Sequence, residues 1–187
     1  GAIVVLHACC HNPTGADLAA AQWERVIEIV NARGLVPFLD IAYQGLAESL
    51  DADAAAVRRF AQACPIALVA SSFSKSLSLY GERVGALSVA TRNADEAARV
   101  LSQVKRVIRT NYSNPPLFGG QIVTTVLTTP ELRTLWDKEL GQMRDRIKVM
   151  RRQLVDKIRA IRADFDFGFI IAQRGMFSYS GLTKEHV

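Results

Sequence analysis

Short apolar runs alternate with amphipathic segments through the first half of the chain, and this alternation constrains the fold more than any other feature. Apolar side chains recur at helical spacing from Trp23 to Val30, Gly34 follows as a C-terminal cap, and a second helix is expected at about 51–63. The runs typical of strands are residues 2–8, 35–39, 66–70 and 84–90. Strands that alternate with helices build a mostly parallel sheet, so we expect an α/β fold.

The second half of the chain is predominantly helical. A helical pattern begins at Asn93, the run Asn114-Pro115-Pro116 interrupts it, and Pro130 begins a long helix with apolar residues every three or four positions. That helix would be roughly 45 Å long, which suits a connector between two domains. We expect a large domain over 1–128, a connecting helix over 129–162 and the start of a small α/β domain over 163–187.

Composition excludes several classes of protein. The net charge of +5 is spread along amphipathic helices without a basic, aromatic-interleaved tract, so we expect no nucleic-acid partner. No apolar run approaches the length of a membrane span. The three cysteines have no scaffold spacing, which indicates a reducing compartment and a cytoplasmic location. The run from His7 to His11 lacks zinc-site spacing, so no metal is expected.

Lys75 is the strongest candidate for chemistry. It follows an apolar strand, stands in the hydroxyl-rich run Ser71-Ser72-Phe73-Ser74, and precedes Arg83, which lies between Gly81 and Gly85. Partial burial at a strand end would make its amine nucleophilic, and hydroxyls with a guanidinium bind phosphate. The setting suits a Schiff base between Lys75 and a phosphorylated aldehyde better than it suits a solvated surface lysine.

Four further residues have both a structural and a functional interpretation. Asp40, at the end of a strand, is either a carboxylate with a structural partner or the partner of a protonated ring nitrogen. Tyr43 is a core aromatic residue or a donor to a ring oxygen, and Asn12 is a turn residue or a second donor to that oxygen. Arg109 complements the end of a helix dipole or binds a substrate carboxylate.

Six motifs together resemble those of the aspartate and aromatic-amino-acid aminotransferases, the fold-type I, class I enzymes that use pyridoxal phosphate. The resemblance covers the whole chain and slightly favours the aromatic, tyrosine-type branch, mainly through Cys9-Cys10 and Ser78-Leu79-Tyr80-Gly81, whereas Asn114 and the run Gly181-Leu182-Thr183-Lys184-Glu185 are closer to the aspartate branch. The motifs are His11-Asn12-Pro13-Thr14-Gly15, Asp40-Ile41-Ala42-Tyr43-Gln44-Gly45, Ser72-Phe73-Ser74-Lys75, Tyr80-Gly81-Glu82-Arg83-Val84-Gly85, Asn111-Tyr112-Ser113-Asn114-Pro115-Pro116 and Arg174-Gly175-Met176-Phe177-Ser178.

The resemblance implies a three-layer fold, with residues 1–128 part of the pyridoxal-phosphate-binding large domain. It implies transamination between an aromatic amino acid or aspartate and 2-oxoglutarate, in amino-acid metabolism, by a homodimer with shared active sites. Lys75 would form the Schiff base and act as general base. Asp40 would pair with the pyridine nitrogen, and Asn12 and Tyr43 would contact the ring hydroxyl. The phosphate would be held by Ser72, Ser74 and Arg83, and the substrate by Asn12 and Arg109.

The chain also departs from that family. The family's phosphate loop and ring-stacking aromatic residue are expected before Gly1, and its arginine for the substrate α-carboxylate after Val187, so we expect an internal fragment that is inactive alone. One alternative is therefore a truncated, non-catalytic fragment with only a structural role. Another is a Rossmann-type dinucleotide binder, which the missing G-x-G-x-x-G after the first strand disfavours.

Overall fold

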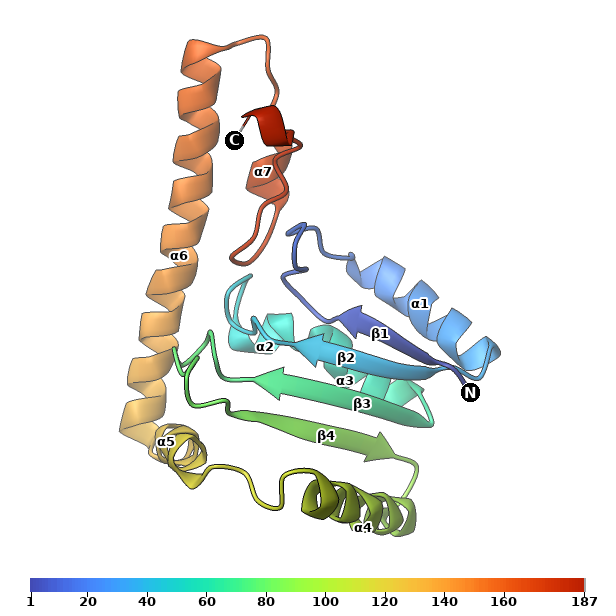
Figure 1. The fold of residues 1–187 in the computed structure, drawn as a ribbon. Coiled ribbons are helices and arrows are strands. Elements are labelled where there is room, and N and C mark those ends of the chain that lie inside the picture. Colours follow the sequence, from blue (N-terminus) through green and yellow to red (C-terminus); the bar gives the residue numbers. More distant parts are fainter. Residues whose placement is uncertain (187) are drawn as a thin grey trace.

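The computed structural model describes residues 1–186, and a four-stranded sheet forms its centre (Figure 1). The sheet order is β1-β2-β3-β4, with β1 to β3 mutually parallel and β4 antiparallel to β3. The strands are β1 (Ile3–His7), β2 (Val36–Ile41), β3 (Ile66–Ser72) and β4 (Gly85–Thr91). The expected mostly parallel α/β sheet is confirmed, and the arrows of β1 to β3 in Figure 1 all point toward α6 (Pro130–Ile161).

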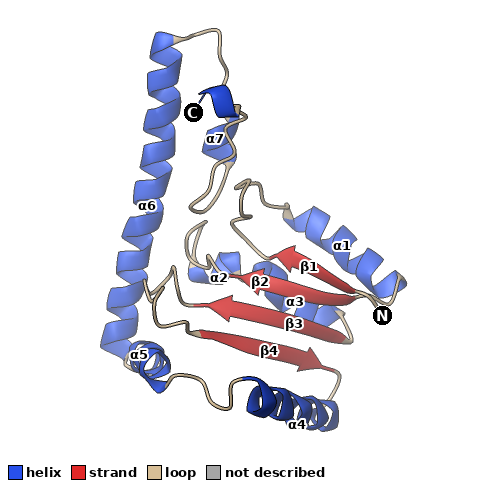
Figure 2. Ribbon diagram, in the orientation of Figure 1, coloured by secondary structure: helices blue, strands red, loops and turns tan. Residues whose placement is uncertain are grey.

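Helices lie on both faces of this sheet, as Figure 2 shows by element type. Helices α1 (Ala20–Ala32) and α3 (Ala55–Ala63) share one face, where the Trp23 and Phe60 rings meet edge to face at 5.9 Å. Leu39 and Val69 point into that layer, so their neighbours in the pleat point the other way. Helix α4 (Ala94–Asn111) packs on β4, on the other face of the sheet. Side chains of α4 and Leu87 of β4 together line a hollow there.

The end of α1 is the helix cap that the sequence predicts. Gly34 has a φ of +60°, a conformation that favours glycine because it has no Cβ. Its N–H donates to the Asn31 carbonyl at 3.2 Å, and the Leu35 N–H donates to the Val30 carbonyl at 2.9 Å. These are the two hydrogen bonds of a Schellman motif, which turns the chain directly into β2.

Two local predictions need correction. The helix expected at about 51–63 is divided into α2 (Leu50–Asp53) and α3 at Ala54, whose φ of −91° and ψ of 5° depart from helical values. Asp40 does not end its strand but lies inside β2, where its Cα is paired with His7 of β1 and Ala70 of β3. The strand continues because the Ala8 N–H donates to the Asp40 carbonyl at 2.9 Å.

The long helix is present and is anchored to the sheet's loops. Helix α6 has 32 residues with a proline in its first turn, which gives a length of about 48 Å. It follows α5 (Leu117–Thr128), and the Trp136 indole donates to the Ser76 carbonyl at 2.7 Å. None of the helices in residues 1–186 is both long and apolar enough to cross a bilayer.

The sequence predicts the start of a small α/β domain in the tail. Residues 163–186 contain α7 (Phe169–Ala172) and a short 3-10 turn (Lys184–His186) but no strand. The tail folds back beside α6 toward the loops that follow β1 and β2 (Figure 1). The carbonyls of Gly175 and Phe177 accept hydrogen bonds from the Arg151 side chain of α6 and not from a neighbouring strand. The division into domains remains a prediction.

Candidate active site

Three of the predicted site residues meet at one edge of the sheet. The parallel strands β1, β2 and β3 place their carboxyl ends side by side, and the loops that follow carry Asn12, Tyr43 and Lys75. The Lys75 Nζ lies 4.9 Å from the centroid of the Tyr43 ring. The Asn12 amide nitrogen donates to the Tyr43 hydroxyl at 3.4 Å. The arrangement places a partly buried amine over an aromatic ring, beside an amide and a phenol.

The loop that carries Lys75 is held by its own hydroxyls and by α6. Ser74 is buried, with 6% of its surface exposed. Its N–H donates to the Ser72 hydroxyl at 3.2 Å, and the neighbouring Ser76 is also buried and bound through its carbonyl by Trp136. Because the backbone around it is held on both sides, the Lys75 amine is carried by a rigid support.

Asp40 supplies a carboxylate with no competing partner. It is partly buried and alternates with the core residues Leu39 and Ile41, so its side chain projects to the sheet face away from α1 and α3. Within residues 1–186 this carboxylate makes no hydrogen bond and no ion pair. A partly buried carboxylate left free in this way is available to a positively charged group of a ligand.

Arg83 and Arg109 are not joined to the other site residues. Arg83 is exposed, and its guanidinium donates to the Tyr80 carbonyl at 2.9 Å. Its φ of +52° is uncommon for a residue with a side chain, and such conformations concentrate in functional loops. Arg109 lies in the last turn of α4 and donates to the Ser113 hydroxyl. The structure places neither guanidinium in contact with Lys75.

Two aspartates that the sequence does not mark as site residues, one buried and one partly buried, organise the loops around the site. Asp17 accepts hydrogen bonds from the N–H groups of Cys10 and His11 at 2.8 and 2.9 Å. Asp53 accepts from the N–H groups of Gly45, Ala47 and Glu48 at 2.8, 3.0 and 2.9 Å, and from that of Ser49 at 3.5 Å. The only sequence signal for Asp17 is its position just after the turn at Gly15. The only signal for Asp53 is its position in the first turn of a helix that Ser49 caps.

Asp53 also lies beside two buried thiols. Ligand atoms of Cys9, Cys10 and Asp53 are all within 4.8 Å of one another. A hydrogen bond with Cys10, together with burial, raises the pKa of the Cys9 thiol and keeps it protonated. Both Asp53 oxygens are occupied by backbone N–H donors, so the cluster acts as a loop anchor.

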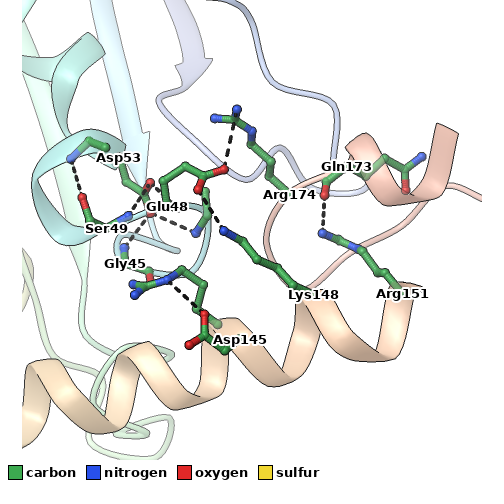
Figure 3. A network of polar contacts seen from close by, with 12 residues as sticks. Gly45, Glu48, Ser49, Asp53, Asp145, Lys148, Arg151, Gln173 and Arg174 are labelled. Atoms are coloured by element: carbon green, nitrogen blue, oxygen red, sulfur yellow. Dashed lines mark hydrogen bonds and ion pairs between the residues drawn. The ribbon is translucent and has the colours of Figure 1, made fainter. Parts of the chain in front are cut away.

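A polar network ties the tail to the sheet and to α6 (Figure 3). Glu48 pairs with Lys148 of α6 at 2.8 Å and with Arg174 of the tail at 3.8 Å. The hydrogen bond from Lys148 holds the pKa of the Glu48 carboxyl below its usual range. The Phe177 ring meets the Tyr43 ring edge to face at 5.8 Å. Residues distant in sequence therefore complete the surroundings of Tyr43.

Known proteins share both this sequence and this fold. The family model for aminotransferase class I and II matches residues 1–187. An aspartate aminotransferase of Pseudomonas aeruginosa is 63% identical over 99% of this chain and 46% of its own length. An aromatic-amino-acid aminotransferase of Escherichia coli is 52% identical over 99% of this chain and 47% of its own length.

A solved structure gives the same result. The aromatic-amino-acid aminotransferase from Burkholderia pseudomallei, covalently bound to pyridoxal phosphate, has a TM-score of 0.96 and 69% identity over 98% of this chain and 46% of its own. The chain thus spans about half the length of the relatives that it matches. From these matches and the α/β sheet described above, the chain belongs to the class I and II aminotransferase family.

Proposed function

We propose that the whole protein is a pyridoxal-phosphate-dependent aminotransferase. It would exchange the amino group of an aromatic amino acid or aspartate with 2-oxoglutarate. One observation carries the proposal: the Lys75 amine lies over the Tyr43 ring at the sheet edge where α/β enzymes bind their ligands. Family membership supports the reaction class.

The groups on this chain fit the cofactor. Pyridoxal phosphate presents an aldehyde, a ring hydroxyl, a ring nitrogen and a phosphate. The chain offers a matching group for each in the same order. These are the Lys75 amine, the Asn12 amide with the Tyr43 phenol, the Asp40 carboxylate, and the hydroxyls of Ser72 and Ser74. When bound, the cofactor supplies an electron-withdrawing ring that weakens the bonds at the α-carbon of an amino acid. The cofactor follows from the family and from the covalent complex of its relative.

Lys75 has two proposed tasks. Its amine would hold the cofactor covalently, and the same amine, when free, would accept the α-proton of an amino acid as a general base. The Tyr43 ring shields one side of the partly buried amine from bulk water. The buried Ser74 and Ser76 hold the loop, so the amine returns to the same place in each turnover.

Asp40, Asn12 and Tyr43 are proposed to hold the ring. The free carboxylate of Asp40 would keep the ring nitrogen protonated, because an anion favours the charged form of a nearby base. The Asn12 amide donates to the Tyr43 hydroxyl at 3.4 Å, and this proximity supports the proposal that both groups donate to one ring oxygen. Asn12 would contact the substrate as well.

Ser72, Ser74 and Arg83 are proposed to hold the phosphate. Ser72 and Ser74 lie on one turn, where the Ser72 hydroxyl accepts the Ser74 N–H. Arg83 would exchange its present bond to the Tyr80 carbonyl for the stronger bonds that a guanidinium makes with an anion. Residues 1–187 alone are expected to be inactive, since the resemblance places further phosphate and substrate ligands outside them.

Arg109 is proposed to bind the distal carboxylate of a substrate in the active site of a second subunit. Its guanidinium is exposed and, within residues 1–186, is bound only to the Ser113 hydroxyl, which fits a role outside this chain's own site. The protein would then be a homodimer with shared active sites. The three free, buried cysteines suit the reducing conditions of the cytoplasm, where we propose that it acts.

The experiment is a turnover profile of the full-length protein. It is supplied with pyridoxal phosphate, 2-oxoglutarate and, in turn, tyrosine, phenylalanine or aspartate, and glutamate formation is measured. The proposal predicts glutamate from all three, with the aromatic substrates faster. Absence of glutamate with every amino acid would overturn the proposed activity, and a clear preference for aspartate would overturn the aromatic assignment.

A further inference from the structure

Arg151 is a buried cation whose partners in the described residues are all neutral oxygens. It lies on α6 with 7% of its surface exposed. Its Nε donates to the Ser178 hydroxyl at 3.0 Å, and its Nη2 donates to the carbonyls of Gly175 and Phe177 at 2.7 and 2.6 Å. Its Nη1 donates to the Gln173 carbonyl, as Figure 3 shows. One guanidinium thus binds four residues of a single tail segment, 173–178.

The other side of this segment is fixed against the loop that carries Asn12. The Arg174 N–H donates to the Gly15 carbonyl at 2.7 Å, and the Tyr179 N–H donates to the Thr14 carbonyl at 3.3 Å. A Cβ on Gly15 would lie 2.5 Å from the Phe177 carbonyl oxygen, so the two backbones are in direct contact. The segment is therefore held between α6 and the loop after β1.

The same segment presents a ring to the site. Phe177 packs edge to face on Tyr43 at 5.8 Å, and Tyr43 in turn contacts both Asn12 and Lys75. An edge-to-face contact restrains the orientation of both rings. A continuous series of contacts therefore runs from the Arg151 guanidinium, through the Phe177 backbone and ring, to the aromatic ring beneath the Lys75 amine.

We propose that Arg151 is a positioning residue for the active site, which holds segment 173–178 so that Phe177 fixes the Tyr43 ring beside Lys75. This inference rests on the function proposed above. A guanidinium suits the task because its planar fork reaches several acceptors at once, whereas the ammonium of a lysine is a single point. Loss of the guanidinium leaves the carbonyls of Gln173, Gly175 and Phe177 without this donor, and the segment then loosens.

The test compares two arginines of the full-length protein. Arg151→Lys keeps the charge but cannot span the four acceptors. Arg152→Lys is the matched control, since Arg152 is the next residue of the same helix and is exposed. The first readout needs no cofactor: hydrogen–deuterium exchange at the amides of 174–179. We expect faster exchange there in Arg151→Lys and an unchanged pattern in Arg152→Lys.

The second readout distinguishes positioning from simple support of the fold. In the protein loaded with pyridoxal phosphate, Arg151→Lys is expected to shift the pH midpoint of the cofactor absorbance and to lower kcat roughly tenfold or more, with little change in KM. Phe177→Leu should give the same changes. The double variant should be no worse than the more severe single one, because both act through the same contact.

Each outcome decides the proposal. The proposal is overturned if Arg151→Lys has the absorbance and kcat of the wild type. It is also overturned if the losses of kcat in Arg151→Lys and Phe177→Leu are fully additive in the double variant. If Arg151→Lys does not fold, Ser178→Ala removes only the Nε acceptor, and unchanged exchange and absorbance in that variant would overturn it as well. A wild-type protein that does not attach the cofactor would instead overturn the proposed function, which the exchange measurement does not use.

Discussion

The amine of Lys75 lies over the ring of Tyr43, with Nζ 4.9 Å from the ring centroid. This contact joins the loops after β2 and β3, which are adjacent strands of the sheet. The face of an aromatic ring attracts an ammonium group, and it also shields one side of the amine from water. Tyr43 is itself buried and bound by Asn12 and Phe177, so the position of the amine depends on residues from three separate parts of the chain.

Replacing Arg109 is expected to change substrate preference more than fold. In full-length protein, Arg109→Ala should lower turnover of aspartate far more than turnover of tyrosine, because only aspartate has a second carboxylate to bind. Arg106→Ala, an exposed arginine one turn earlier in α4, is the control. Steady-state kinetics with both amino acids measure the effect, and equal losses for the two would argue against the proposed role.

Gly175 is expected to tolerate no side chain. Its φ is +77°, and a Cβ there would overlap the Cys10 Cβ and lie 2.8 Å from the Cys10 Sγ. Gly175→Ala should therefore lower the free energy of unfolding by about 3 kcal/mol. Gly181→Ala is a matched control, with a φ of +73° and nothing within 4 Å, and should cost only about 1 kcal/mol. Urea denaturation compares them, and equal losses would show that backbone conformation alone is responsible.

Asp53 is expected to stabilise the loop from Gly45 to Ser49. An asparagine in its place would turn one acceptor oxygen into a donor that faces backbone N–H groups, so Asp53→Asn should cost about 2–3 kcal/mol. Asp51→Asn on the same short helix removes only an exposed pair with Arg58 and should cost less than about 1 kcal/mol. A shift in the urea midpoint that is as large for Asp51→Asn would contradict this account.

The pair between Glu48 and Lys148 predicts a small dependence of stability on pH. Because Lys148 lowers the pKa of Glu48 in the folded protein, the unfolded chain binds more protons than the folded one at pH values between the two pKa values of Glu48. The contribution is complete above the usual Glu pKa of 4.5 and is lost as pH falls through the lower folded value. Lys148→Met should cost about 0.5 kcal/mol at neutral pH and much less in acid, since both side chains are half-exposed. A cost that does not change with pH would point to lost packing.

The sequence predicted the sheet well because each strand has a local signature. Apolar runs and the Gly34 cap identify β1, α1 and β2 without any knowledge of tertiary contacts. The antiparallel direction of β4 could not be predicted, because the pattern of a strand does not record its direction. The division between α2 and α3 could not be predicted either, since the helical pattern of 51–63 does not reflect the backbone angles of Ala54.

The candidate site shows the same limit. Asn12, Tyr43 and Lys75 were predictable as a group because adjacent parallel strands deliver their loops to one edge. The role of Arg151 was not predictable, because the sequence shows it only as one of several basic residues on a long helix. Its burial arises only when the tail folds back onto α6, a contact 22 to 27 residues away along the chain.

The central claim is that Lys75 binds the cofactor covalently, and one measurement tests it directly. Full-length protein loaded with pyridoxal phosphate is reduced with borohydride, digested and mapped by mass spectrometry, with Lys75→Arg as the control. We predict a reduced cofactor adduct on Lys75 in the wild type and none in the variant. An adduct on a different lysine in the wild type, or an undiminished adduct in Lys75→Arg, would contradict the account.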